Sequence, residues 1–245
     1  MAEADWTELS DNLSSASVTR GPVTSAVVAL PNGNDGSFVF GQHSLTNDPG
    51  VVAYYSNEVG FAPLSKCGFI HGGLQKGVSA GGNLFSPFLF ICLGGTVSTS
   101  LAYMLGLDDS ATPRLVLRKG QLSTGIPAAA PGAQGVLRRS TSTYSLGAWL
   151  HVRLDAIKQP TGDVLLQVFA NNITANGIDT PTWEAIAGLS DFTDDALGVN
   201  SSLLGITGTD SLPLVGGRVG WGCRVADVNR NAYFAMVRPE KQDLP

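Results

Sequence analysis

The sequence predicts an all-β protein: a two-sheet antiparallel β-sandwich of the jelly-roll type with very little helix. Short segments rich in β-branched and aromatic residues recur along the whole chain, which is typical of strands. Glycine and proline, 30 and 13 of the 245 residues, gather between these segments, where tight turns need them. About thirteen such segments in one chain favour two packed sheets.

Each predicted strand lies between groups of turn residues. Turns are predicted at residues 31–36, 47–50, 81–82, 160–163 and 216–217. The predicted strands are 24–30, 37–44, 50–55, 67–76, 87–93, 102–107, 115–119, 135–140, 149–157, 164–170, 183–187, 219–225 and 232–238.

The clearest hairpin joins residues 149–157 to residues 164–170 through the turn at 159–163. Its first strand alternates, with Leu150, Val152, Leu154 and Ala156 on one face and Trp149, His151, Arg153 and Asp155 on the other. A second hairpin is predicted between 217–225 and 230–238. Residues 189–197 are the one short helix expected, with Ser190 or Asp191 as its N-cap.

We expect one domain over residues 1–245, with 1–20 as an N-terminal arm and 239–245 as a C-terminal tail. The three cysteines, Cys67, Cys92 and Cys223, form no CxxC pair and predict buried thiols in a reducing compartment. The polar, acidic N-terminus does not resemble a secretory signal, so synthesis in a host cytoplasm is expected.

Charge and hydropathy exclude several classes of protein. Fifteen Lys and Arg against twenty Asp and Glu give a net charge of −5, which argues against a nucleic-acid binder. Hydrophobic residues make up 43%, too many for a disordered chain. No apolar run reaches the roughly 18 residues that a membrane-spanning helix needs.

Two stretches carry a family resemblance. Residues 101–127, LAYMLGLDDSATPRLVLRKGQLSTGIP, and residues 149–237, which end in GGRVGWGCRVADVNRNAYFAMV, resemble the concanavalin A-like (laminin G-like) lectin and glucanase superfamily. The chain is more loosely similar to virion structural proteins of tailed bacteriophages. The superfamily commonly has an acidic residue near the end of the final strand, whereas here Phe234 is followed by Ala235, which puts a metal or sugar role there in doubt.

The sequence gives no sign of catalysis. The resemblance implies glucanase carboxylates spaced Glu-x-Asp-x-x-Glu on one strand, and none of the five glutamates fits. His43, His71 and His151 are scattered, and His151 is expected to be a solvated cross-strand partner of Arg153 and Asp155. The pattern GxSxG around Ser79 precedes no helix and is interpreted as a loop. We therefore expect a non-enzymatic protein.

The resemblance makes calcium the candidate metal and glycans the candidate ligands, although we expect no cofactor. Possible calcium donors are Asn47, Asp48, Asp108, Asp109, Asp194 and Asp195. Glycan-stacking candidates are Tyr54, Tyr55, Trp149, Trp183 and Trp221, with filling of the sandwich core as the alternative for the tryptophans.

Residues 77–107 contain no Asp, Glu, Lys or Arg. A sandwich strand usually has one wet, charged face, so this stretch favours either a central strand buried on both faces under a loop or a surface covered by another subunit. The predicted protein interface consists of Leu84, Phe85, Phe88, Phe90, Thr96, Ser98, Ser100, Arg118, Lys119, Arg138 and Arg139.

The function expected from the sequence is a structural protein of a tailed-phage virion, for example a capsid decoration or a head or tail component. It would act through contacts with other virion proteins and with itself as a homo-oligomer. The alternative is a lectin-like carbohydrate-binding module, for example for attachment to glycans of a host surface. No nucleic acid and no membrane is expected as a partner.

Overall fold

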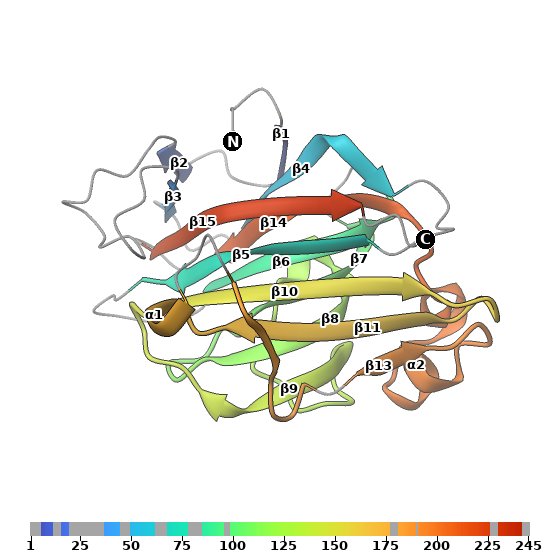
Figure 1. Cartoon of the computed structure of the whole chain (residues 1–245). Helices are drawn as coiled ribbons and strands as arrows, with labels where there is room; N and C mark the ends of the chain where they lie inside the picture. Colours follow the sequence, from blue (N-terminus) through green and yellow to red (C-terminus); the bar gives the residue numbers. More distant parts are fainter. Residues whose placement is uncertain are drawn as a thin grey trace.

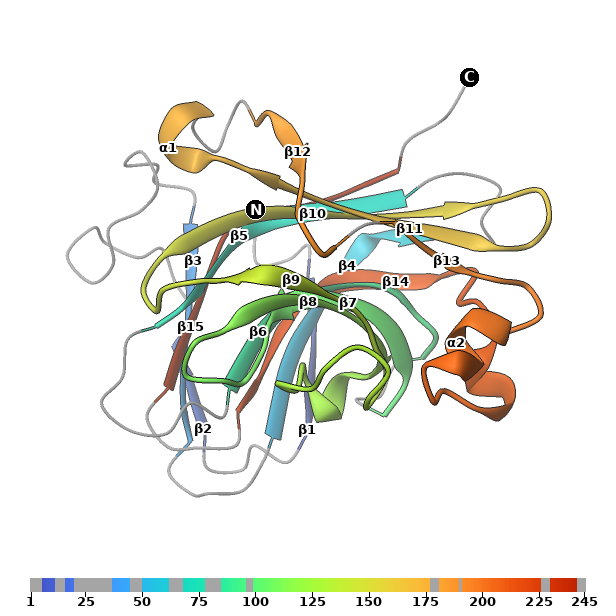
Figure 2. The ribbon, with the colours of Figure 1, turned by 90° about the horizontal axis from the view of Figure 1, so that it is seen from below.

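The computed structural model describes residues 6–11, 16–19, 37–44, 50–61, 68–77, 85–95, 99–176, 181–189, 191–225 and 230–241. Over these residues the chain forms two antiparallel β-sheets packed face to face (Figures 1 and 2), which confirms the predicted all-β sandwich. No helix in this part of the chain is long and apolar enough to cross a membrane.

The first sheet, sheet A, has seven strands in the order β1-β4-β14-β6-β7-β8-β9. In chain order they are β1 (Trp6–Asp11), β4 (Gly50–Phe61), β6 (Phe85–Leu93), β7 (Leu101–Leu107), β8 (Arg114–Gln121), β9 (Val136–Thr143) and β14 (Gly217–Val225). The central strand β6 therefore lies between β14 and β7.

The second sheet, sheet B, follows the order β12-β11-β10-β5-β15-β3-β2, with β13 also paired to β11. Its strands are β2 (Ala16–Thr19), β3 (Ser37–Ser44), β5 (Gly68–Lys76), β10 (Trp149–Lys158), β11 (Val164–Asn171), β12 (Trp183–Ala185), β13 (Phe192–Asp194) and β15 (Arg230–Lys241). The hairpin predicted from 149–157 and 164–170 is confirmed as β10 and β11, paired from His151↔Asn171 to Lys158↔Val164.

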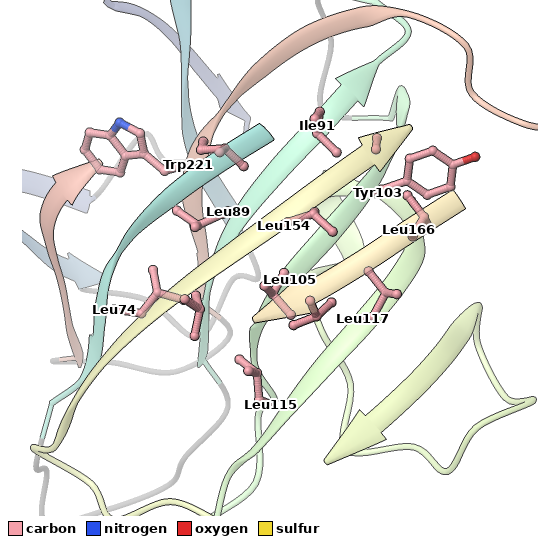
Figure 3. Packing of buried hydrophobic residues seen from close by; sticks show 14 of the residues in the cluster. Leu74, Leu89, Ile91, Tyr103, Leu105, Leu115, Leu117, Leu154, Leu166 and Trp221 are labelled. Carbon is pink, nitrogen blue, oxygen red and sulfur yellow. The ribbon is translucent and has the colours of Figure 1, made fainter. Parts of the chain in front are cut away.

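The main core lies between the sheets and is filled by the inward halves of the alternating strands. Leu74, Leu154 and Leu166 of sheet B pack with Leu89 and Leu105 of sheet A in one cluster (Figure 3). All five side chains are fully buried. The alternation predicted for β10 is confirmed here, since Val152, Leu154 and Ala156 belong to the same cluster.

A second apolar cluster covers the opposite, outer face of sheet A. Phe88, Phe90 and Met104 point outward and are buried by residues 122–136 of the same chain, which we call the covering segment. Leu122, Ile126 and Val136 are its apolar contacts. Every residue of β6 is consequently buried, which explains the missing charges of this strand by burial on both faces under a loop.

Two local predictions were wrong. The predicted C-terminal hairpin does not form, because β14 belongs to sheet A and β15 to sheet B. Their aromatic residues Trp221 and Phe234 face each other across the core, with ring centroids 4.7 Å apart. Residues 189–197 contain β13 where a helix was expected, and the helix α2 (Val199–Leu203) begins later. Asp195 caps it by accepting hydrogen bonds from the backbone N–H groups of Val199 and Asn200.

Both chain ends also differ from expectation. Parts of the predicted N-terminal arm form edge strands, β1 in sheet A and β2 in sheet B. Part of the predicted C-terminal tail, residues 239–241, continues β15. The predicted strand at 24–30 lies outside the described residues. The remaining short elements are α1 (Ile173–Asn176) and two 3₁₀ turns, η3 (Leu122–Thr124) and η4 (Gly208–Ser211).

Candidate functional site

The outer face of sheet B carries a group of aromatic and ionisable side chains that extends from the edge strand β12 to β5. Directly paired residues of neighbouring strands project to the same face, so the register places these side chains in rows. His71 on β5 pairs with Arg153 on β10, and Arg153 pairs with Phe169 on β11. In the next row His151 pairs with Asn171, and Asn171 with Trp183 of β12.

We call this group the histidine–tryptophan platform; its members are Phe69, His71, His151, Arg153, Asp155, Phe169, Asn171 and Trp183. They come from four strands and from positions up to 114 residues apart in the sequence (183 − 69 = 114). Phe69, His71, His151, Asp155 and Asn171 are buried, whereas Arg153, Phe169 and Trp183 are half-exposed.

A directed chain of hydrogen bonds fixes the two imidazoles. The side-chain oxygen of Asn171 accepts from the Thr182 backbone N–H and from Asn176 Nδ2, both at 3.1 Å. Asn171 Nδ2 therefore donates to His151 Nδ1 at 3.1 Å, which puts the His151 hydrogen on Nε2. That N–H in turn donates to His71 Nδ1 at 3.1 Å, so His71 also carries its hydrogen on Nε2.

Both histidines are neutral at physiological pH. Burial lowers the pKa of His71 to about 4, and the positive charges of Arg238 and Arg153 add to this effect. Burial lowers the pKa of His151 to about 3, with smaller contributions from His71 and Arg238. The pair thus supplies polar, uncharged groups in the middle of the platform.

Beside the histidines, an ion pair is packed among aromatic rings. Arg153 donates two hydrogen bonds to the carboxylate of Asp155, each 2.6 Å long. The guanidinium carbon lies 4.0 Å from the ring centroid of Phe69, 5.7 Å from that of Phe169 and 6.0 Å from that of Trp183. Burial nevertheless raises the pKa of Asp155, against the lowering effect of Arg153.

Trp183 stands over the two imidazoles. Its ring centroid lies 4.8 Å from that of His151 and 5.5 Å from that of His71, both in edge-on arrangements. The indole is half-exposed, so one part of it packs on the histidines while another faces solvent. Such a side chain offers an apolar surface next to hydrogen-bonding groups.

The predicted stacking residues lie in different environments. Trp183 belongs to the platform, while Trp221 is 5% exposed and fills the core, as the alternative for the tryptophans stated. Tyr55 is half-exposed on the outer face of sheet A, with the Arg218 guanidinium 4.7 Å from its ring centroid. The side chain of Tyr54 lies outside the described ones. Trp149 is half-exposed at the start of β10.

The predicted protein interface needs correction at its aromatic residues. Phe85, Phe88 and Phe90 are at most 1% exposed and pack inside the chain, so they form no docking surface. The apolar composition that suggested a subunit contact reflects burial under the covering segment. Ser100 is half-exposed, and Leu84, Thr96 and Ser98 lie outside the described residues.

Two of its basic residues are also buried and bonded internally. Arg118 donates to the carbonyls of Gln134 and Gly125 in the covering segment and to Thr124 Oγ1. Lys119 forms an ion pair with Asp194 at 2.7 Å, and neither side chain is exposed. An interface role for Arg118 and Lys119 was therefore wrong.

The other two predicted interface arginines also have partners within the chain. Arg139 binds the buried carboxylate of Asp108 at 2.9 Å. Arg138 lies over the ring of Phe192, 4.9 Å from its centroid. Both are half-exposed, and their predicted role in subunit contacts stays a prediction.

The acidic candidates for calcium binding serve other contacts. Asp194 accepts from Lys119, Tyr103 and Ser201, and Asp195 caps α2. Asp109 accepts the backbone N–H of Ala128 at 2.8 Å. Asn47, Asp48 and the GxSxG serine Ser79 are not among the residues that the structure describes. Within those it does describe, no group of three or more His, Cys, Asp and Glu side chains is placed to hold a metal ion.

Most of the platform was missed by reasoning from the sequence. The polar row His151, Arg153 and Asp155 was predicted, but as a solvated face rather than a half-buried one. Its partner His71 is 80 residues away in the sequence, and only the pairing of β5 with β10 brings the two imidazoles together. The one local signal for the outward orientation of His71 was its position next to Ile70, which faces the core.

Comparison with known proteins defines the fold and little more. No protein-family model matches the chain, and no curated protein matches it. Its structure is similar to the exoplasmic/lumenal domain of VIP36 in a Ca²⁺- and Man3GlcNAc-bound form, with a TM-score of 0.51 and 10% identity, covering 100% of this chain and 86% of that one. The carbohydrate recognition domain of Emp46p has a TM-score of 0.48 at 12% identity, covering 96% and 86%. The carbohydrate-binding module CBM66 from Bacillus subtilis has a TM-score of 0.40 at 9% identity, covering 94% and 97%.

At these identities the similarity shows the fold alone. The VIP36 match supports the lectin-like sandwich that the sequence resemblance implied. The expected phage role gains no support from these three structures.

Proposed function

We propose that the chain is a carbohydrate-binding domain and that it binds sugar at the histidine–tryptophan platform. The carrying observation is the half-exposed Trp183, which stands over two neutral histidines beside the Arg153–Asp155 ion pair. Binding sites of this kind combine aromatic surface with a few polar groups that fix the ligand's orientation. A sugar ring has the matching chemistry, with an apolar face to stack and hydroxyl groups to bond.

The similarity to VIP36 adds support at the level of the fold. That protein's structure contains a bound Man3GlcNAc, so a sandwich of this kind is able to hold an oligosaccharide. The identity of the sugar does not carry over at 10% identity. The virion role expected from the sequence is compatible with glycan binding but has no support of its own.

The proposal includes binding without cleavage. Glycoside hydrolysis uses two carboxyl groups on either side of the scissile bond. Among the platform residues Asp155 is the carboxylate, and both of its oxygens accept hydrogen bonds from Arg153. His151 is bonded on both ring nitrogens, to Asn171 and His71, which favours a positioning role over proton transfer with a ligand.

The test is a panel of neutral and acidic oligosaccharides titrated into the whole chain by calorimetry, followed by the same titrations with Trp183→Ala. The variant is expected to lose at least tenfold in affinity for any sugar that binds. Tyr55→Ala is the matched control, because Tyr55 is a half-exposed aromatic residue on the outer face of the other sheet. It is expected to bind like the wild type.

Two outcomes overturn the proposal: no oligosaccharide binds the wild type at millimolar concentration, or the two variants weaken binding equally. Chromatography of the incubated sugar tests the second part of the proposal, namely that the sugar is bound but not cleaved. New reducing ends that depend on His71 or His151 contradict binding without cleavage.

A further inference from the structure

One arginine extends the platform on the strand beside His71. In β15 the residue Val237 is buried in the core, and the next residue, Arg238, points to the outer face and is exposed. Its register partner on β5 is His71, so Arg238, His71 and Arg153 lie in one row across three strands. The row continues the platform to the β15 side.

A β-bulge sets this position. The pairing of β15 with β5 shifts register between Ala235 and Arg238. Bulges of this kind redirect a side chain and are common next to functional sites. Without the shift, continued alternation from core-facing Phe234 would point residue 238 toward the core.

Arg238 adds a positive charge beside a platform whose own charges cancel, and Glu240 of the same strand pairs with Phe69 in the neighbouring row. Arg153 is neutralised by Asp155, and the two histidines are neutral at physiological pH. Among the side chains that the structure describes, Arg238 forms no ion pair. Its field nevertheless reaches the site, because it lowers the pKa of both His71 and His151.

We propose that the histidine–tryptophan platform selects acidic saccharides, with Arg238 binding a carboxylate or sulfate group of the sugar. The inference rests on the proposed carbohydrate binding and names the class of ligand. A guanidinium presents a planar fork of N–H donors that matches both anions in geometry. An aromatic surface at Trp183 and a cation at the β15 side then fix the two ends of one charged sugar unit.

The experiment compares three hexasaccharides in calorimetry: an oligogalacturonate, the same oligomer with its carboxyl groups reduced to alcohols, and a sulfated neutral hexasaccharide. The wild type is expected to bind at least one anionic oligomer about tenfold more tightly than the reduced one. The two anionic arms show whether the site takes a carboxylate or a sulfate. Added salt is expected to weaken the anionic complex.

Arg238→Gln is expected to remove this preference, so that the variant binds the anionic and the reduced oligomers equally. Arg218→Gln is the matched control, since Arg218 is a half-exposed arginine on the outer face of sheet A. Glu240→Gln removes a negative charge from the same strand and is expected to strengthen anion binding or leave it unchanged.

The results separate the two proposals. Equal binding of the reduced and anionic oligomers overturns the selectivity for anions. An unchanged preference in Arg238→Gln overturns the assignment of that selectivity to Arg238, and carbohydrate binding stands in both cases. Failure of every saccharide to bind the wild type overturns carbohydrate binding itself. Loss of binding to all oligomers in Arg238→Gln also overturns the inference, because it assigns Arg238 a general structural role.

Discussion

The outer faces of the two sheets differ although the same kind of strand builds both. The outer face of sheet A carries Phe88, Phe90 and Met104, and the covering segment buries them in a second core. The outer face of sheet B, between the edge strand β12 and β5, carries histidines, an ion pair and a half-exposed tryptophan. One face therefore contributes to the stability of the domain, and the other carries the groups of the proposed sugar site.

The contrast also explains the uneven charge of the sequence. Stretches without charge, such as residues 85–93, are buried on both sides and need no wet face. One of the charges of sheet A, that of Arg118, holds the covering segment. A low charged fraction, 14% for the chain, here reflects an extra buried layer.

The largest expected effect tests whether the outer face of sheet A is a true core. Phe90→Ala removes a fully buried ring from the second cluster and is expected to lower the free energy of unfolding by about 3–5 kcal/mol. Urea denaturation measures it. Phe169→Ala, at a half-exposed position of the platform, is the control and should cost less than half as much. A loss below about 1 kcal/mol for Phe90→Ala contradicts a packed second core.

The two histidines of the platform are expected to make the free energy of unfolding decline at low pH. The pKa values of His71 and His151 in the folded state, about 4 and about 3, lie below the ordinary 6.5, so the unfolded chain takes up protons first as the pH falls. Above pH 6.5 the two neutral histidines therefore make their full contribution to the free energy of unfolding. This contribution declines as the pH falls toward 4 and below, by about 3 kcal/mol for His71 alone. Unfolding free energies at several pH values measure the slope.

The control for this acid effect is the double variant His71→Gln and His151→Gln. It is expected to lack this share of the decline between pH 6.5 and pH 4, while carboxylates elsewhere still contribute. Identical slopes in the variant and the wild type would place the acid sensitivity outside the platform.

A smaller effect is expected from the cover of sheet A. Arg118→Met leaves the carbonyls of Gln134 and Gly125, the second of them buried, without this donor. We expect a loss of about 2 kcal/mol in the free energy of unfolding together with faster proteolysis within residues 122–135. Arg114→Met, on the same strand but bonded to Ser140 and Thr141, serves for comparison. Equal proteolysis of the two variants contradicts a clamping role for Arg118.

The smallest expected effect comes from a change in the direction of the hydrogen-bond chain. In Asn171→Asp both side-chain oxygens are acceptors, so His151 must place a hydrogen on Nδ1, and the new negative charge raises its pKa by about one to three units. Nitrogen NMR of the imidazoles follows this shift. An unchanged His151 titration would mean that Asn171 does not set the tautomer.

The sequence predicts the sandwich and most of its strands because their local patterns are strong. The alternation in β10 even predicts which side chains face outward. The same pattern does not show that Trp183 and His71 contact His151 on that face. Those contacts depend on pairing between strands whose residues are 32 and 80 positions apart in the sequence. Trp183 and Trp221 illustrate the limit, since the same residue type lies half-exposed in one strand and in the core in another.

The sequence also does not predict how the chain passes from one sheet to the other or which segment covers the outer face of sheet A. The aromatic strands at 217–225 and 230–238 have the composition of a hairpin, and nothing local shows that the chain crosses from one sheet to the other between them. Burial under residues 122–136 was one of two explanations for the uncharged stretch. The choice depended on where a distant loop folds, which the pattern within β6 does not encode.

The double burial of β6 has a consequence for how the molecule opens. Its backbone pairs with β14 on one side and β7 on the other, and both of its faces are packed. Local fluctuations at an edge or a loop are therefore expected to leave its paired amides protected from water. Their hydrogens should exchange with solvent deuterium only when the whole domain unfolds, which makes β6 the reporter of global stability in this fold.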